Sequence, residues 1–203
     1  PMGSWHSADP VQDLIDNLPD SSLLVLDEAY IDLAPKGTAP DLRPETDNVI
    51  RLRTFSKAYG MAGARVGCAI GPKSLISAFD KMRNHFGVSR ISQAGALAAL
   101  KDQAYVAEIA QKVAQSRETL AEIADDNNLI ALPSATNFVT IDCGGDGDFA
   151  RAVLEQTVAR SVFIRMPAVA PMNRCIRISC GDSAAMALVA TVLPQALKAA
   201  RLS

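Results

Sequence analysis

The stretch Arg53–Gly67, which reads RTFSKAYGMAGARVG, constrains this chain more than any other part of it. It sets one lysine, Lys57, among small, hydroxylic and glycine residues. Apolar runs at 48–52 and 66–70, on either side of that lysine, predict two short strands. Because glycine tolerates tight turns and close approach of another backbone, the glycines of the stretch suit a compact connection. The sequence therefore predicts a lysine presented on a loop between two strands.

The side chains around Lys57 suit a phosphate group. Thr54 and Ser56 offer hydroxyls, and Arg65 offers a planar fork of donors. A lysine beside such donors is what a cofactor with both an aldehyde and a phosphate requires. A solvated lysine on a loop is the alternative, and for an isolated Ser-Lys pair it would be the better interpretation. The length of the pattern and a second motif upstream favour the cofactor.

The second motif is Leu24–Tyr30, which reads LVLDEAY. Together with the lysine stretch, it resembles the pyridoxal-phosphate motifs of the class I/II aminotransferases, and it is most similar to the histidinol-phosphate aminotransferase branch. Further matches near the C-terminus extend the resemblance to nearly the whole chain. The resemblance implies a pyridoxal 5'-phosphate cofactor. It also implies an α/β chain of the PLP-dependent transferase fold type I, here the later part of the large α/β domain followed by a small α+β C-terminal domain.

The resemblance gives each motif residue an expected role. Lys57 would bind the cofactor aldehyde covalently and then move the proton of the substrate α carbon. Asp27 ends an apolar run, at the edge of a parallel sheet where ligands bind, and would pair with the pyridine nitrogen. Tyr30 would hydrogen-bond the phenolic oxygen, whereas the sequence indicates no role for Glu28. The residues expected at the cofactor phosphate are Thr54, Ser56 and Arg65.

Two arginines near the C-terminus are candidate substrate ligands. Arg165 and Arg177 each lie in or at the end of an apolar run of strand length, where an arginine needs an anion. In most relatives of this type the second arginine holds the substrate α-carboxylate, and in the histidinol-phosphate branch two arginines bind the substrate phosphate. Bidentate geometry suits either anion. The alternative is a pair of strand arginines on a solvated face.

Composition excludes several other classes of function. The net charge is −2 with acidic and basic residues interspersed, so nothing indicates a nucleic-acid partner. No unbroken apolar run reaches the roughly 18 residues of a membrane span, and no signal peptide is evident. The four cysteines form no CxxC pair and the two histidines are far apart, so no metal site is expected. We expect a soluble, cytoplasmic protein.

The resemblance implies two domains. Residues 1–105 would form the C-terminal portion of the large cofactor-binding domain, and 106–203 the small domain. A helical pattern over 89–124 is long for one helix, so a break near 101–103 is expected. In the second domain, strands are expected at 129–132, 137–141, 162–165 and 175–179, with helices at 149–159 and 183–197.

The chain begins Pro1-Met2-Gly3, which resembles the tail of an Asn-Pro-Thr-Gly segment found midway along such enzymes. We therefore expect the C-terminal part of a longer protein that forms a homodimer and uses a small-molecule amino donor and an oxo-acid acceptor. The leading hypothesis is transfer of an amino group between L-glutamate/2-oxoglutarate and histidinol phosphate/imidazole acetol phosphate. Alternatives are a general or aromatic amino-acid aminotransferase, or an inactive fragment of such an enzyme. The related threonine-phosphate decarboxylases share much of the motif, with a glycine where this chain has Ser56.

Overall fold

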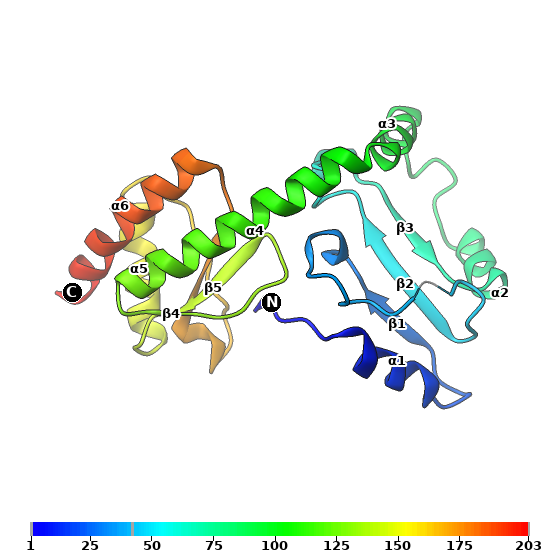
Figure 1. The fold of residues 1–203 in the computed structure, drawn as a ribbon, viewed down its shortest axis with the longest axis horizontal. Helices are drawn as coiled ribbons and strands as arrows, with labels where there is room; N and C mark the ends of the chain where they lie inside the picture. Colours follow the sequence, from blue (N-terminus) through cyan, green and yellow to red (C-terminus); the bar gives the residue numbers. More distant parts are fainter. Residues whose placement is uncertain (1, 42, 203) are drawn as a thin grey trace. The chain divides into compact units, whose positions relative to one another are not determined.

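The computed structural model describes residues 2–41 and 43–202, which form two compact units (Figure 1). The first unit is Trp5–Ala110, and the second is Gln111–Ser203 together with Pro1–Ser4. Pro1, on which part of the Pro1-Met2-Gly3 comparison rests, lies outside the described residues.

The first unit is built on a three-stranded sheet with the order β1-β2-β3 (Figure 1). β1 and β2 are parallel, and β2 and β3 are antiparallel. The strands are β1 (Leu24–Asp27), β2 (Val49–Thr54) and β3 (Gly67–Ile70). The helices are α1 (Ala8–Asp16), α2 (Lys73–Ile76) and α3 (Arg90–Lys101), with 3-10 helices at Ile31–Leu33, Ala62–Ala64 and Ser77–Lys81.

The register of this sheet decides which side chains share a face. Asp27 pairs with Leu52 across the parallel strands, and Thr54 pairs with Gly67 across the antiparallel ones. Because side chains alternate along a strand, Asp27, Leu52 and Thr54 project from one face. Glu28 and Arg53, each one residue away, project from the other face. The polar side chains of Asp27 and Thr54 are therefore on the opposite face of the sheet from those of Glu28 and Arg53.

The second unit packs helices against an antiparallel sheet with the order β4-β5-β6. Its strands are β4 (Ile130–Ala131), β5 (Phe138–Asp142) and β6 (Cys175–Ser179). Its helices are α5 (Gly147–Val158) and α6 (Ser183–Ala200), with a 3-10 helix at Met172–Arg174. α4 (Gln103–Asp126) begins in the first unit and contributes to the second. The core centres on five fully buried side chains: Leu120, Ile141, Val153, Ile176 and Leu193.

Aspartate side chains cap the starts of α4, α5 and α6. Asp146 accepts a hydrogen bond from the N–H of Phe149 at 2.9 Å, and Asp182 accepts one from Ala185 at 2.8 Å. The expected break in the long helical pattern is confirmed, since α3 ends at Lys101 and α4 begins at Gln103. Asp102 lies between them and accepts from the N–H of Tyr105, so a capping carboxylate restarts the helix there.

One expectation about strands is wrong. Residues 162–165 form no strand beyond one bridge, because the N–H of Val162 is taken by the Thr157 carbonyl at the end of α5. Pro167, which lacks a donor, follows shortly afterwards. In β1, Val25 is 50% exposed, so the face of this strand that bears Val25 is not covered by the described residues.

Helix α6 is long and apolar enough to cross a membrane by length and composition alone, although it contains no unbroken apolar run of that length. Its buried residues, among them Met186, Val189 and Leu193, belong to the core of the second unit. That position is the one expected for the core helix of a globular domain.

Candidate active site

Lys57 lies in a closed loop at the end of β2. The N–H of Phe55 donates to the Val66 carbonyl at 3.2 Å, and the N–H of Met61 donates back to the Phe55 carbonyl at 2.9 Å. Phe55 and Ala58, on either side of Lys57, are buried and anchor the loop. The loop therefore holds the lysine between two fixed points while leaving its own side chain half-exposed.

Two glycines of the loop are required by its geometry. Gly60 has a φ of +68°, a conformation that residues with a side chain rarely adopt. At Gly67, a Cβ atom would lie 2.7 Å from the Arg53 carbonyl oxygen, so only glycine permits this approach of β3 to β2. Gly63 has open space around it and no positive φ, and the structure gives no reason for a glycine there.

The expected phosphate donors divide into a pair and a separate residue. The hydroxyls of Thr54 and Ser56 lie 3.0 Å apart, and the N–H of Ser56 donates to Thr54 Oγ1 at 3.1 Å. Arg65 has a left-handed backbone conformation with φ +52°, and its guanidinium donates to the Ala62 carbonyl at 2.9 Å. The hydroxyl of Ser92 also holds this 62–65 turn, because it donates to the Ala64 carbonyl at 2.8 Å.

Asp27 and Tyr30 approach the lysine from the neighbouring strand. Asp27 is exposed at the end of β1, and one of its carboxylate oxygens accepts from the Ala29 N–H at 3.0 Å. The ammonium nitrogen of Lys57 lies 5.0 Å from the centre of the Tyr30 ring, a cation–π distance. Asp27 ends β1 and Thr54 ends β2, and both project from the same face of the sheet. The structure therefore brings one residue of each motif to the same end of that face.

Arg165 and Arg177 belong to the second unit, where they are paired across the bridge between 165 and 177. The Arg177 guanidinium lies 4.2 Å from the centre of the Phe138 ring and is half-buried, whereas Arg165 is exposed. The structure thus brings together the two expected substrate ligands as one pair.

Sequence reasoning missed a buried ionic cluster behind Asp27. Glu28 bridges Arg51 and Arg53, with oxygen–nitrogen distances of 3.2 Å and 2.8 Å. Arg51 also donates to the carbonyls of Pro40 and Asp41, at 2.9 Å and 2.8 Å. The sequence does contain a sign of this cluster. Arg51 and Arg53 are two residues apart in β2 and therefore share a face, on which an acidic side chain such as Glu28 can pair with both.

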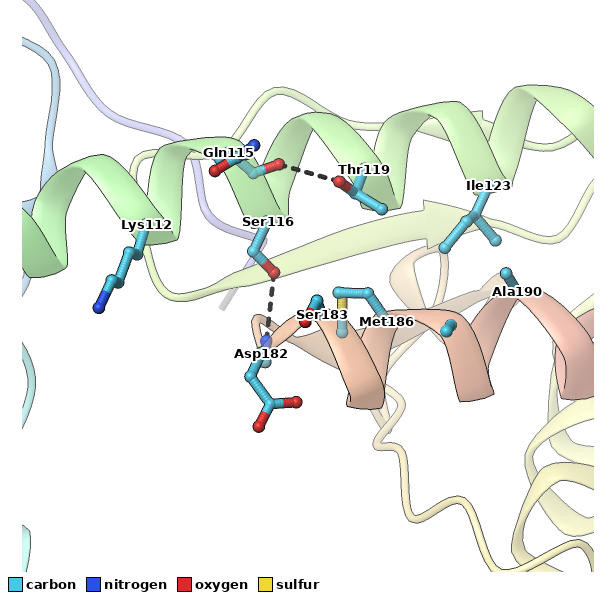
Figure 2. A pocket seen from close by; sticks show the side chains of 11 residues that line it. Lys112, Gln115, Ser116, Thr119, Ile123, Asp182, Ser183, Met186 and Ala190 are labelled. Atoms are coloured by element: carbon cyan, nitrogen blue, oxygen red, sulfur yellow. Dashed lines mark hydrogen bonds between the residues drawn. The ribbon is translucent and has the colours of Figure 1, made fainter.

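A cavity of about 580 Å³ lies in the second unit between α4 and the start of α6, and Figure 2 shows it from close by. Ser116 and Met186 line it, and the Ser116 hydroxyl accepts from the Gly181 N–H at 3.2 Å. None of the side chains expected to bind cofactor or substrate lines this cavity. Within residues 2–41 and 43–202, no group of three or more His, Cys, Asp or Glu side chains is arranged to hold a metal ion.

The cysteines are poor candidates for catalysis. Burial raises the pKa of the Cys143 thiol to about 12, against a weaker effect of a backbone hydrogen bond. Burial also raises the thiol pKa of the other three: Cys68, Cys175 and Cys180. Because the thiolate is the reactive form, these shifts count against a cysteine as the nucleophile.

Known proteins resemble this chain over nearly its whole length. The model of the family "Aminotransferase class I and II" matches residues 1–193. The histidinol-phosphate aminotransferase of Geobacillus sp. (strain WCH70) is 34% identical over 201 residues, which are 98% of this chain and 54% of that protein. The one from Bacillus pumilus (strain SAFR-032) is 35% identical over 204 residues, 99% of this chain and 55% of that protein. The chain therefore spans about half the length of these curated relatives.

Among solved structures, histidinol-phosphate aminotransferase from Sinorhizobium meliloti, in complex with pyridoxal-5'-phosphate, is similar with a TM-score of 0.95 and 50% identity. The similarity covers 100% of this chain and 56% of that one. The expected fold class, the PLP-dependent transferase fold type I, is confirmed by this likeness. The chain belongs to the class I and II aminotransferase family.

Proposed function

We propose that the protein is a pyridoxal-phosphate-dependent aminotransferase that exchanges an amino group between L-glutamate/2-oxoglutarate and histidinol phosphate/imidazole acetol phosphate. One observation carries the proposal: Lys57 follows directly on the Thr54–Ser56 hydroxyl pair, at the strand edge that also bears Asp27. The names of the relatives described above support the choice of substrate.

The residues at this edge fit pyridoxal 5'-phosphate. The paired hydroxyls of Thr54 and Ser56 are half-buried at the end of β2 and can donate hydrogen bonds to a phosphate. Asp27 is within the same face and exposed, as a partner of a ring nitrogen needs to be. Arg65 would have to exchange its contact with Ala62 for the phosphate.

When bound, the cofactor supplies an aldehyde and an electron-accepting ring. Lys57 would hold that aldehyde through its amine, with release of water, and its freed amine would move the proton at the substrate α carbon. Asp27 would keep the ring nitrogen protonated through a charge-assisted hydrogen bond. Tyr30 would hydrogen-bond the phenolic oxygen.

In the second unit, Arg177 is proposed to hold an α-carboxylate, and Arg165 to add the second cation that a substrate phosphate uses. A general or aromatic amino-acid aminotransferase is the second candidate. It is favoured by the unequal burial of the two arginines, since a single half-buried arginine suffices for a carboxylate.

We also propose that the protein acts as a homodimer in the cytoplasm, and that the two domains divide as 1–105 and 106–203. Support for a dimer comes from the segment 79–91 of the first unit, which exposes several large apolar side chains. They are Phe79, Met82, Phe86, Val88 and Ile91. Such a group is unusual on a surface without a partner, and a second copy would bury it.

The test of the proposed function is covalent labelling of the whole protein with pyridoxal 5'-phosphate. Wild type should show a visible absorbance band that borohydride abolishes, and the peptide that contains Lys57 should then carry the cofactor mass. Lys57→Ala should fold normally by circular dichroism and lose the label and transamination, whereas the exposed-lysine control Lys73→Ala should keep both. Label on a different lysine, or turnover by Lys57→Ala without added amines, would refute the assignment.

A further inference from the structure

The buried carboxylate of Glu28 links the two strand ends that carry the proposed cofactor residues. Glu28 is 8% exposed and follows Asp27 directly, and its N–H continues the parallel pairing by donating to the Leu52 carbonyl at 2.9 Å. One carboxylate oxygen contacts Arg51 at 3.2 Å and the other contacts Arg53 at 2.8 Å. A single side chain directly after β1 therefore engages two successive side chains on one face of β2.

The Glu28–Arg51–Arg53 cluster lies on the opposite face of the sheet from Asp27 and Thr54. Asp27 and Thr54 project from one face of the sheet, and Glu28 and Arg53 project from the opposite face. Asp27 is thus the covalent neighbour of Glu28, and Thr54 is the covalent neighbour of Arg53. A shift of Glu28 relative to Arg53 along the strands moves Asp27 relative to Thr54 by the same amount.

No short turn fixes the register of these two strands. β1 and β2 are parallel, only four residue pairs long, and joined by the long connection 28–48. Arg51 holds that connection as well, through the carbonyls of Pro40 and Asp41. Burial of Glu28 and Arg51, with Arg53 partly buried beside them, is a poor way to gain stability, because apolar residues do as well without the cost of desolvation. Setting a register is the better-attested use of such groups.

We infer that Glu28 is a positioning residue: by bridging Arg51 and Arg53, it fixes the alignment of β1 on β2 and so the placement of Asp27 relative to the Thr54–Lys57 segment. The inference rests on the proposed function, since it assigns Glu28 a part in holding the cofactor. Glu28 itself touches neither cofactor nor substrate in this assignment. It acts through Arg53 and the strand register.

The experiment compares Glu28→Gln, Arg53→Gln and the double variant in the whole protein, with Asp142→Asn as a matched control. Asp142 pairs with Arg174 at 3.0 Å, so its loss also breaks an ion pair, but one that belongs to the second unit and not to the sheet of β1 and β2. For each protein, three quantities are measured: the melting temperature without cofactor, the dissociation constant of pyridoxal 5'-phosphate, and the half-reaction with L-glutamate at saturating cofactor.

Glu28→Gln should weaken cofactor binding roughly 10-fold and lower the saturated half-reaction rate by a similar factor, with the KM for L-glutamate unchanged. Arg53→Gln should do the same, and the double variant should be no worse than either single one, because both act through one contact. The control should lose melting temperature with an unchanged dissociation constant.

A Glu28→Gln protein that melts earlier but binds cofactor and reacts as wild type does would show a structural role only. Additive losses in the double variant would overturn the route through Arg53. If Glu28→Gln does not fold, Glu28→Asp keeps the charge but shortens the bridge, and cofactor affinity equal to wild type would then count against the inference. Failure of wild type itself to bind the cofactor would instead refute the proposed function and, with it, this inference.

Discussion

Arg165 and Arg177 lie directly opposite each other and exchange both backbone hydrogen bonds, at 3.0 Å from Arg165 N and 2.6 Å from Arg177 N. Such a pair places its two side chains on the same face of the antiparallel ladder. The two candidate substrate ligands are therefore held as neighbours by backbone contacts, even though no strand forms around Arg165. Two adjacent guanidinium groups carry more charge than one carboxylate uses.

Arg165→Ala should therefore affect the two substrates unequally. A phosphate monoester carries up to two negative charges and three oxygens, so it can use both arginines, whereas in our proposal L-glutamate is held mainly by Arg177. Each charge-assisted contact is worth about 1.5–3 kcal/mol, which predicts a loss of roughly 10- to 100-fold in kcat/KM for histidinol phosphate. The measurement is kcat/KM of each half-reaction in the whole protein.

Arg177→Ala is the companion variant and should harm both substrates. Its guanidinium also stacks on Phe138, so part of its effect reflects lost packing. Equal losses for both substrates on Arg165→Ala, or no turnover of histidinol phosphate by wild type, would favour the general amino-acid aminotransferase.

Asp27→Asn should retain the cofactor but slow the half-reaction with L-glutamate. A carboxylate stabilises a protonated ring nitrogen, and an amide of the same shape does so far less. At about 1.5–3 kcal/mol for a hydrogen bond to a charged group, the rate should fall on the order of 10- to 100-fold. The single-turnover rate at saturating L-glutamate is the quantity to compare, and an unchanged rate would mean that Asp27 merely ends β1.

Two of the predicted features depend only on residues that are close together in the sequence. Lys57, Thr54 and Ser56 lie within four residues of one another, and the structure places the two hydroxyls side by side. The break between α3 and α4 was predictable for the same reason, because Asp102 caps the helix it precedes. In each case the residues that determine the structure are close together in the sequence.

The parts that escaped prediction depend on pairings between distant segments. Glu28 contacts Arg51 and Arg53 only because β1 pairs with β2 in one register, and a shift of one residue would turn the arginines to the other face. The apolar run at 162–165 has the pattern of a strand, but the N–H of Val162 donates to the Thr157 carbonyl at the end of α5 and is not free for strand pairing. Local pattern does not reveal such competition for backbone hydrogen bonds.

Asp32 gives a prediction about stability and pH. Burial raises the pKa of its carboxyl above the ordinary value of 3.8, against the opposing effect of Arg53. The folded state therefore favours the protonated form, and the stability that this form contributes is full below about pH 3.8 and lost as pH rises through the folded pKa. Asp32→Asn mimics the protonated form. It should raise the melting temperature at pH 7 and change it much less near pH 4, and the reverse order would contradict the assignment.

The last prediction concerns Thr140, at the centre of β5 opposite Arg177. Its side chain is fully buried, and its hydroxyl oxygen has no hydrogen-bond partner among the described residues. A buried hydroxyl without a partner costs about 1–3 kcal/mol, and valine has nearly the same shape and suits a strand. Thr140→Val should therefore raise the free energy of unfolding by about 1 kcal/mol, measured by urea titration with circular dichroism.

Thr157→Val is the matched control, because the equally buried Thr157 hydroxyl donates to the Leu154 carbonyl at 2.8 Å. That variant should lose about 1 kcal/mol. If both variants are destabilised to the same extent, the Thr140 hydroxyl has a partner after all.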